Sequence, residues 1–265
     1  MAEACGDILL YTDSDCVPEP NWVEEMLRPF EDEAVVAVKG AYLSPQPQLV
    51  ARFAQVEFEE RYEMLKQVPS IDMIDTYSAG FRLPILRETG GFDTSYTAAN
   101  NEDTELSYRL AEAGHRMVFN ASAVVNHLGH PDSVRRYSRL KFWRGYWRIK
   151  VYQQHPSKAV TDTYTPQSLK LQIALLYLTL AIATLSPFIS VAAYLAAAGA
   201  LAFLATTIPF TAFAIRRDIA VGALSPFFLA MRAGAIGAGV LWALVGFFFR
   251  WPTNRATRTR EAGNI

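Results

Sequence analysis

Residues 6–15, with the sequence GDILLYTDSD, decide the fold of the N-terminal half of this chain. Ile8 to Thr12 form a continuous apolar run, which is typical of a strand buried on both faces of a parallel sheet. The run ends on two carboxylates, Asp13 and Asp15, separated by one residue. Because open α/β sheets bind ligands at the carboxyl ends of their strands, we expect a ligand site at these acids.

Outward from this strand, apolar runs alternate with amphipathic segments, as in an α/β layer fold. We expect Asn21 to cap the first helix and Gly90-Gly91 to stop the third. Further strands are predicted at 34–38, 72–77 and 116–119, and helices at 22–27, 48–67, 84–86 and 101–113.

The two halves of the 265-residue chain differ sharply in charge. Residues 1–132 contain 9 Lys/Arg and 23 Asp/Glu, whereas residues 133–265 contain 16 Lys/Arg and 3 Asp/Glu. Residues 171–215 carry no charge, a helical length of about 66 Å against a hydrocarbon core of about 30 Å. This excludes a purely soluble protein. We expect a catalytic part at 1–132, an interfacial helix and linker at 133–168, a transmembrane region of two to three helices at 169–250 and a basic tail at 251–265.

The spans are expected near 171–186, 188–212 and 233–249, and the third is interrupted on its approach by Arg232. Three spans would place the basic tail on the side opposite the catalytic half, which the positive-inside tendency disfavours. A re-entrant or interfacial third segment removes the conflict. Since residues 1–7 do not form a secretory signal, we expect a multi-pass protein of the cell (inner) membrane with its catalytic part in the cytoplasm.

The segment 133–155 mixes basic and aromatic side chains and contains no acid. This composition also occurs in nucleic-acid-binding segments, but directly before a membrane region it favours a helix at the lipid headgroups. We therefore expect a membrane partner and no nucleic acid. The alternative is a solvated helix that covers the acidic half.

Several side chains are candidates for chemistry. Asp13 and Asp15 can hold a hard divalent cation that neutralises a departing pyrophosphate, although Asp-x-Asp also occurs on ordinary turns. Glu102 and Asp103 open a helix, where they either cap it or take a proton from an acceptor hydroxyl. His127 at a strand end is either a structural residue or an imidazole ligand.

Three further features bear on this site. His130, three residues beyond His127, is the competing imidazole. Gly80 allows close backbone approach to a substrate or serves a turn, and Arg109 adds a polar group near the helix that Asp103 opens. Cys5 and Cys16 provide neither a disulfide framework nor a zinc cluster.

Over about residues 4–130 the chain resembles the inverting family-2 glycosyltransferases of the GT-A fold. The resemblance implies that Asp13 and Asp15 form the metal and nucleotide-sugar motif, with Asp15 the more direct ligand. The matching residues are, in order, Gly6-Asp7-Ile8-Leu9-Leu10-Tyr11-Thr12-Asp13-Ser14-Asp15, Ser78-Ala79-Gly80-Phe81, Gly90-Gly91-Phe92-Asp93, Glu102-Asp103-Thr104-Glu105-Leu106-Ser107-Tyr108-Arg109-Leu110 and Val124-Val125-Asn126-His127.

The same resemblance implies that Asp103 is the general base supported by Glu102, that His127 binds the metal, and that Gly80 lies beside the acceptor. It implies Mn²⁺ or Mg²⁺ as cofactor, a nucleotide-sugar donor, and a lipid-linked or glycan acceptor. Only about seven residues precede the first strand, so we expect an incomplete GT-A domain without its nucleotide-binding half, followed by the interfacial and transmembrane helices.

Two alternatives remain beside a membrane-associated transferase. A non-catalytic, membrane-anchored remnant or scaffold is compatible with the expected loss of the nucleotide-binding half. An aspartyl phosphotransferase also uses Asp-x-Asp after an apolar strand, with one carboxylate as nucleophile. Its chemistry needs a later lysine near a second acidic pair, and Lys39 and Lys66 are not placed in that way.

Overall fold

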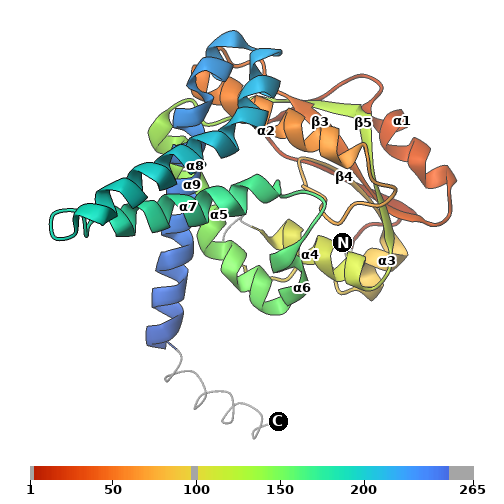
Figure 1. The fold of residues 1–265 in the computed structure, drawn as a ribbon. Coiled ribbons are helices and arrows are strands. Elements are labelled where there is room, and N and C mark those ends of the chain that lie inside the picture. The colour runs from red at the N-terminus through yellow and green to blue at the C-terminus, as the bar shows by residue number, and fades with distance from the viewer. Residues whose placement is uncertain (1–2, 97–100, 251–265) are drawn as a thin grey trace, which may run out of the picture.

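The computed structural model describes residues 3–96 and 101–250, and its N-terminal part is a mixed five-stranded sheet with helices packed on it (Figure 1). The strand order is β1-β4-β3-β5-β2, in which β3 and β5 are parallel and the other pairs are antiparallel. The strands are β1 (Ile8–Thr12), β2 (Cys16–Pro18), β3 (Val35–Leu43), β4 (Ser78–Arg82) and β5 (Arg116–His127).

The helices agree closely with those expected from the sequence as far as α5. Asn21 precedes α1 as expected, but its side chain makes no capping hydrogen bond. The helices are α1 (Trp22–Leu27), the 3₁₀ helix η1 (Arg28–Glu31), α2 (Leu49–Leu65), α3 (Leu83–Glu88), α4 (Glu102–Glu112), α5 (Val134–Gln154), α6 (Pro156–Val160), α7 (Gln167–Ala183), α8 (Ser190–Ile215) and α9 (Ile219–Arg250).

Two strand predictions are corrected by the structure. β1 has the predicted limits, but it lies at an edge of the described sheet, pairs antiparallel with β4, and is only partly buried. Residues 72–77 form no strand, because the Asp72 N–H donates to the Thr163 hydroxyl (3.0 Å) and the Ile74 N–H donates to the Ser107 hydroxyl (2.9 Å). The backbone groups of this segment are thus used outside the sheet, and β4 begins at Ser78.

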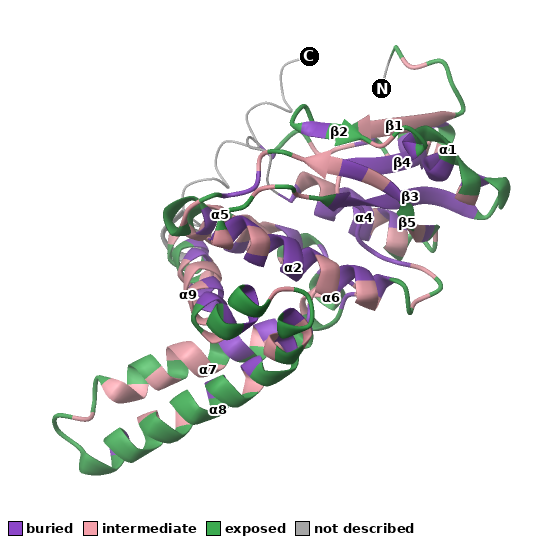
Figure 2. Ribbon diagram, turned by 90° about the horizontal axis from the view of Figure 1, so that it is seen from above, coloured by how far each residue is buried: buried purple, intermediate pink, exposed green. Residues whose placement is uncertain are grey.

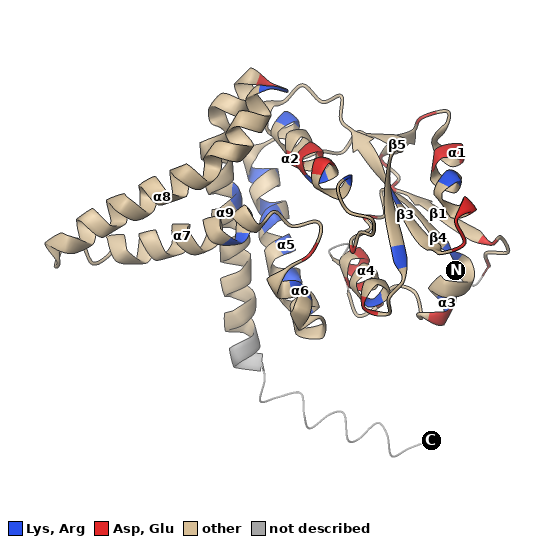
Figure 3. Ribbon diagram, turned by 45° about the vertical axis from the view of Figure 1, so that its right-hand side comes forward, with Lys and Arg blue, Asp and Glu red and all other residues tan. Residues whose placement is uncertain are grey.

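The apolar C-terminal helices dock on α2 and project away from the sheet. α7 and α8 form a hairpin whose side chains are largely exposed or partly exposed, and beyond Lys170 near the start of α7 it carries no charged residue (Figures 2 and 3). Phe53 of α2 stacks on Phe228 of α9 at 4.7 Å between ring centroids. Among the described helices, α8 and residues Ile219–Gly246 of α9 are long and apolar enough to cross a membrane, whereas α7 is shorter.

α9 corrects the expected break at Arg232, since it runs as one helix from Ile219 to Arg250. A break is unnecessary because the Arg232 guanidinium is neutralised by a buried carboxylate of α2, Glu57. The predicted span at 233–249 is therefore the second part of a longer helix. The basic tail predicted at 251–265 lies outside the described residues.

The basic-aromatic helix α5 packs along α9 instead of lying free of the rest of the protein. A Cβ atom on Gly145 would overlap the Ile236 carbonyl oxygen, and one on Gly239 would overlap the Phe142 carbonyl oxygen. Such backbone contact between helices requires residues without side chains. Lys141 is buried on this helix, while Arg135 and Arg139 remain exposed. α5 also contacts the N-terminal half, through Lys141 with Glu57 and through Arg144 with Asn101, and its contact with lipid stays a prediction.

Candidate active site

A cavity of about 400 Å³ lies between the strand ends, the start of α4 and helix α5. Its charged side chains fall into two groups. The acidic cluster consists of Asp13, Asp15, Asp75, Glu102 and Asp103, and the basic cluster consists of Lys141, Arg144 and Arg148, all from α5. The cavity is thus bordered by carboxylates from the β1–β2 turn, the segment before β4 and the start of α4, and by cations from one helix.

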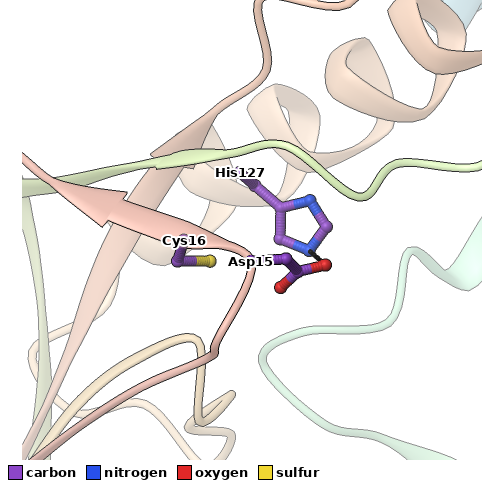
Figure 4. Close-up of side chains that lie close together, drawn as sticks. All are labelled: Asp15, Cys16 and His127. Atoms are coloured by element: carbon purple, nitrogen blue, oxygen red, sulfur yellow. Dashed lines mark ion pairs between the residues drawn. The ribbon is translucent and has the colours of Figure 1, made fainter.

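Asp15 and His127 meet at one border of the cavity, as the sequence predicted (Figure 4). Asp15 follows β1 and His127 ends β5, and the antiparallel pairing of β2 with β5 brings the two together. The distance from His127 Nε2 to Asp15 Oδ2 is 3.8 Å. A Cβ atom on Gly129 would overlap that Asp15 oxygen, so a side chain at this position would displace the carboxylate.

The donor groups of Asp15 and His127 suit a divalent cation. Ligand atoms of Asp15, Cys16 and His127 lie within 4.8 Å of one another. Burial lowers the pKa of His127, although Asp15 opposes this, so the ring is neutral as a ligand must be. The Gly129 N–H donates to His127 Nδ1 at 3.2 Å, which leaves the ring proton on Nε2 and requires a change of tautomer before Nε2 can bind a cation.

The remaining neighbours contribute unequally to such a site. Burial, followed by the charges of Asp13 and Asp15, raises the pKa of Cys16 to about 12, so its thiol stays protonated and is a poor ligand. Burial and the Asp15 charge also raise the pKa of Asp13, which would favour a nearby cation. Asp15, His127 and Asp13 are therefore the residues that would hold Mn²⁺ or Mg²⁺.

His130 lies beside this group without joining it. Its ring is 4.9 Å from the His127 ring, and burial with the His127 charge lowers its pKa to about 3. Its backbone N–H donates to Gln46 at 2.7 Å, which ties the 128–131 loop to the segment after β3. These contacts give His130 a packing role.

Asp103 occupies the first turn of α4, where Asn101 takes a left-handed conformation with φ of 67°. Its Oδ1 accepts the Thr104 N–H at 2.7 Å, and its side chain borders the cavity. Removal from water, followed by the charges of Asp75 and Glu102, raises the pKa of Asp103 to about 7. A carboxylate with such a pKa is suited to accept a proton near neutral pH.

Asp75 is a cavity residue that the sequence did not reveal. It pairs with Lys39, whose side chain is fully buried in β3, and it accepts a hydrogen bond from Tyr164 at 3.4 Å. Residues 72–77 were expected to form a strand, and no role in the site was predicted for Asp75. The lysine within the apolar run of β3 was the available signal, since a buried cation needs a carboxylate partner.

Gly80 and Arg109, which were expected on the acceptor side, are not among the residues that line this cavity. Gly80 is buried in β4, where a Cβ atom would lie 3.0 Å from Leu10 and 3.1 Å from Phe30, so it provides close packing. Arg109 pairs with Glu105 at 2.7 Å and donates to the Gly91 carbonyl at 2.8 Å. It thereby fastens the turn after α3 to α4.

With this geometry established, the family can be assigned. The model of the glycosyltransferase-like family 2 matches residues 1–146, and the chain belongs to this family. Its sheet-and-helix domain is similar to GT-A glycosyltransferases and is followed by two long apolar helices.

Known relatives share the N-terminal part at moderate identity. Pre-mycofactocin glycosyltransferase of Mycobacterium tuberculosis is 26% identical over 164 residues, which is 60% of this chain and 34% of the relative. Glucosyl-dolichyl phosphate glucuronosyltransferase of Haloferax volcanii is 26% identical over 185 residues, which is 62% of this chain and 53% of the relative. The chain thus spans about a third and about half of these proteins.

A solved structure supports the fold over a larger part of the chain. The mannosyltransferase PcManGT from Pyrobaculum calidifontis, in complex with GDP-Man and Mn²⁺, aligns with a TM-score of 0.50 and 18% identity. The alignment covers 92% of this chain and 64% of that one. At this identity the likeness establishes the fold.

Proposed function

We propose that this chain transfers a sugar from a nucleotide-sugar donor to an acceptor hydroxyl, with inversion at the anomeric carbon. The observation that carries the proposal is the position of Asp103 in a cavity whose border also holds Asp15 and His127. In family members the nucleotide sugar supplies a diphosphate leaving group. One cavity therefore contains both a base and the residues that would receive that group.

Asp103 acts as the base in this reaction. It accepts the proton of the acceptor hydroxyl while the acceptor oxygen bonds to the anomeric carbon and the carbon–diphosphate bond breaks. The electron pair of the broken bond leaves with the diphosphate, and attack from the opposite face inverts the configuration. A bound divalent cation would supply charge neutralisation for the diphosphate at Asp15, His127 and Asp13. Glu102 supports Asp103 by adding negative charge beside it.

The acceptor is proposed to be lipid-linked or a glycan presented at the membrane. The basic cluster gives the cavity cations that suit an anionic group on a substrate. The name of the Haloferax relative includes glucosyl-dolichyl phosphate, a lipid-linked sugar with such a group. The exposed apolar hairpin of α7 and α8 supports attachment to a membrane, and we propose an inner-membrane location with the cavity on the cytoplasmic side.

Replacement of the base tests this function directly. Asp103→Asn should lower the rate of transfer by about a hundredfold to ten-thousandfold, because the amide cannot accept the proton. Glu102→Gln is the matched control, since it removes a neighbouring acid of α4 and should cost much less. Transfer is measured with radiolabelled nucleotide sugars and membrane lipid extracts. Full turnover by the Asp103→Asn variant would contradict the assignment.

A further inference from the structure

Arg232 is an isolated charge in the middle of the apolar helix α9. Its side chain is almost completely buried, with 1% of the residue exposed. Its Nη1 lies 2.9 Å from Glu57 Oε1 on α2, and its Nη2 donates to Gln172 Oε1 on α7 at 3.0 Å. An ionisable residue on a potential membrane helix is costly unless it is paired, and it commonly marks a functional position.

Glu57 connects this arginine to the cavity. Its second oxygen, Oε2, lies 2.9 Å from Lys141 Nζ and accepts a hydrogen bond from the Tyr137 hydroxyl at 2.6 Å. Both Lys141 and Tyr137 come from α5 and border the cavity. The Glu57 carboxylate therefore binds Arg232 of the apolar helix α9 through one oxygen. Through the other oxygen it binds two cavity residues, Lys141 and Tyr137.

The charges around Glu57 are strongly unbalanced. Arg61 also approaches Glu57 Oε1, at 3.9 Å, so three cations surround one carboxylate. Burial alone would raise the pKa of Glu57, but Lys141, Arg232 and Arg61 hold it below its usual value. We call Glu57, Arg61, Lys141 and Arg232 the buried ion cluster.

Lys141 is the member of this cluster most sensitive to its surroundings. Burial lowers its pKa to about 7, Glu57 opposes this, and the positive charges of Arg61, Arg144 and Arg232 add to the decrease. The Tyr137 ring also lies 4.9 Å from its ammonium group, and His130 is coupled to it electrostatically. The charge state of this cavity residue therefore depends on a residue of α9.

We propose that Arg232 is a positioning residue of the active site, acting through Glu57 on Lys141 and Tyr137, so that the apolar helices complete the cavity as well as anchoring the protein. For its kinetic consequences this inference rests on the proposed sugar transfer. Two other ion pairs join the same helical region to α2 and provide controls. Arg217 lies 2.8 Å from Glu59, and Asp218 lies 2.6 Å from Arg52, and none of these four residues lines the cavity.

The first experiment measures the reactivity of Lys141 in the full-length protein in detergent, without any substrate. Acetic anhydride modifies neutral amines, and peptide mass spectrometry gives the pH at which Lys141 is half-reactive. Arg232→Met should raise this pH by about one unit. It removes a cation that repels the Lys141 ammonium, and the Glu57 charge that Arg232 had neutralised then stabilises the charged form of Lys141. Arg217→Met should leave it unchanged, and Arg232→Lys should restore the original value.

The second experiment is a double-mutant cycle on kcat/KM for transfer. If Arg232 acts through Lys141, Arg232→Met should cost about tenfold alone and add little to the loss caused by Lys141→Met. Arg217→Met combined with Lys141→Met should instead multiply the separate effects. Thermal unfolding of each variant shows whether a loss arises from lower stability.

The outcomes separate the inference from the proposed function. An unchanged pH of half-reaction in Arg232→Met, or an equal shift in Arg217→Met, would overturn the positioning role. If the protein transfers no sugar, the proposed function fails while the Lys141 reactivity still decides the inference. A shift confined to Arg232→Met, with rescue by Arg232→Lys, supports it.

Discussion

The acidic cluster lines the cavity, whereas the buried ion cluster reaches it only through Lys141, and the two clusters are built in opposite ways. Members of the acidic cluster come from short motifs at strand ends and at the start of α4, and most were recognisable in the sequence. Glu57 and Arg232 are separated by 175 residues and meet only because α2, α5 and α9 pack together. Packing of short motifs around the sheet brings the first cluster together, whereas helix packing positions the second.

The two clusters also differ in what their charges require. The acidic cluster places several negative charges around a cavity, so its charge is neutralised only when a cation or a proton is bound. The buried ion cluster satisfies its carboxylate within the protein. Substitutions in the first should therefore affect binding and rate with little effect on folding, whereas substitutions in the second should also lower stability.

The largest expected effect on stability is at Glu57. Glu57→Gln removes the carboxylate that pairs with buried Lys141, Arg61 and Arg232, so we expect the free energy of unfolding to fall by about 3–5 kcal/mol. Glu59→Gln removes a partly exposed acid of the same helix and should cost less than about 1 kcal/mol. Thermal unfolding in detergent measures both. Equal effects of the two variants would show that burial of the ion cluster does not determine its contribution to stability.

Substitutions of the residues expected to bind the metal should weaken metal binding and leave folding largely intact. Asp15→Ala and His127→Ala should each weaken Mn²⁺ binding by about tenfold to a hundredfold, since each removes a ligand atom. His130→Ala should bind Mn²⁺ like the unaltered protein, because its ring packs beside the site. Isothermal titration calorimetry gives the affinities. Unchanged affinity in His127→Ala would show that the ligand assignment is wrong.

The pH dependence of transfer should report Asp103. As the base it must be ionised, and its pKa is raised to about 7, so the rate should fall about tenfold for each pH unit below 7. Asp75→Asn removes a like charge that contributes to this increase and should move the midpoint to lower pH. Initial rates between pH 5 and 9 test both. A midpoint that stays in place in Asp75→Asn would contradict the proposed electrostatic origin.

The smallest effect is expected from substitutions of exposed basic residues on α5. Arg135 and Arg139 are exposed, so replacing them with Glu should weaken binding to anionic vesicles by about 1 kcal/mol per charge. The free energy of unfolding should change by less than about 0.5 kcal/mol. Co-sedimentation at low salt measures the binding. Vesicle binding that is insensitive to these charges would leave only the apolar helices as a membrane contact.

By itself, the sequence determined the elements whose signals are local. β1, α1, α2 and α4 were predicted within a few residues, because apolar periodicity and terminal acids or glycines act over one or two turns of chain. It also identified Asp15, His127 and Asp103 as residues of a single site, through the order of motifs that the family shares. The structure places these three at one cavity, and their catalytic roles stay predictions.

Only the tertiary structure decided which charges are buried and what neutralises them. Gly80 and Arg109 were expected beside the acceptor, yet one packs in the core and the other fastens a turn. Arg232 was expected to interrupt a span, yet Glu57 neutralises it and α9 continues. The free-energy cost of burying a charge depends on partners that lie far away in the sequence but close in space. A local sequence pattern does not show which distant residues will be close.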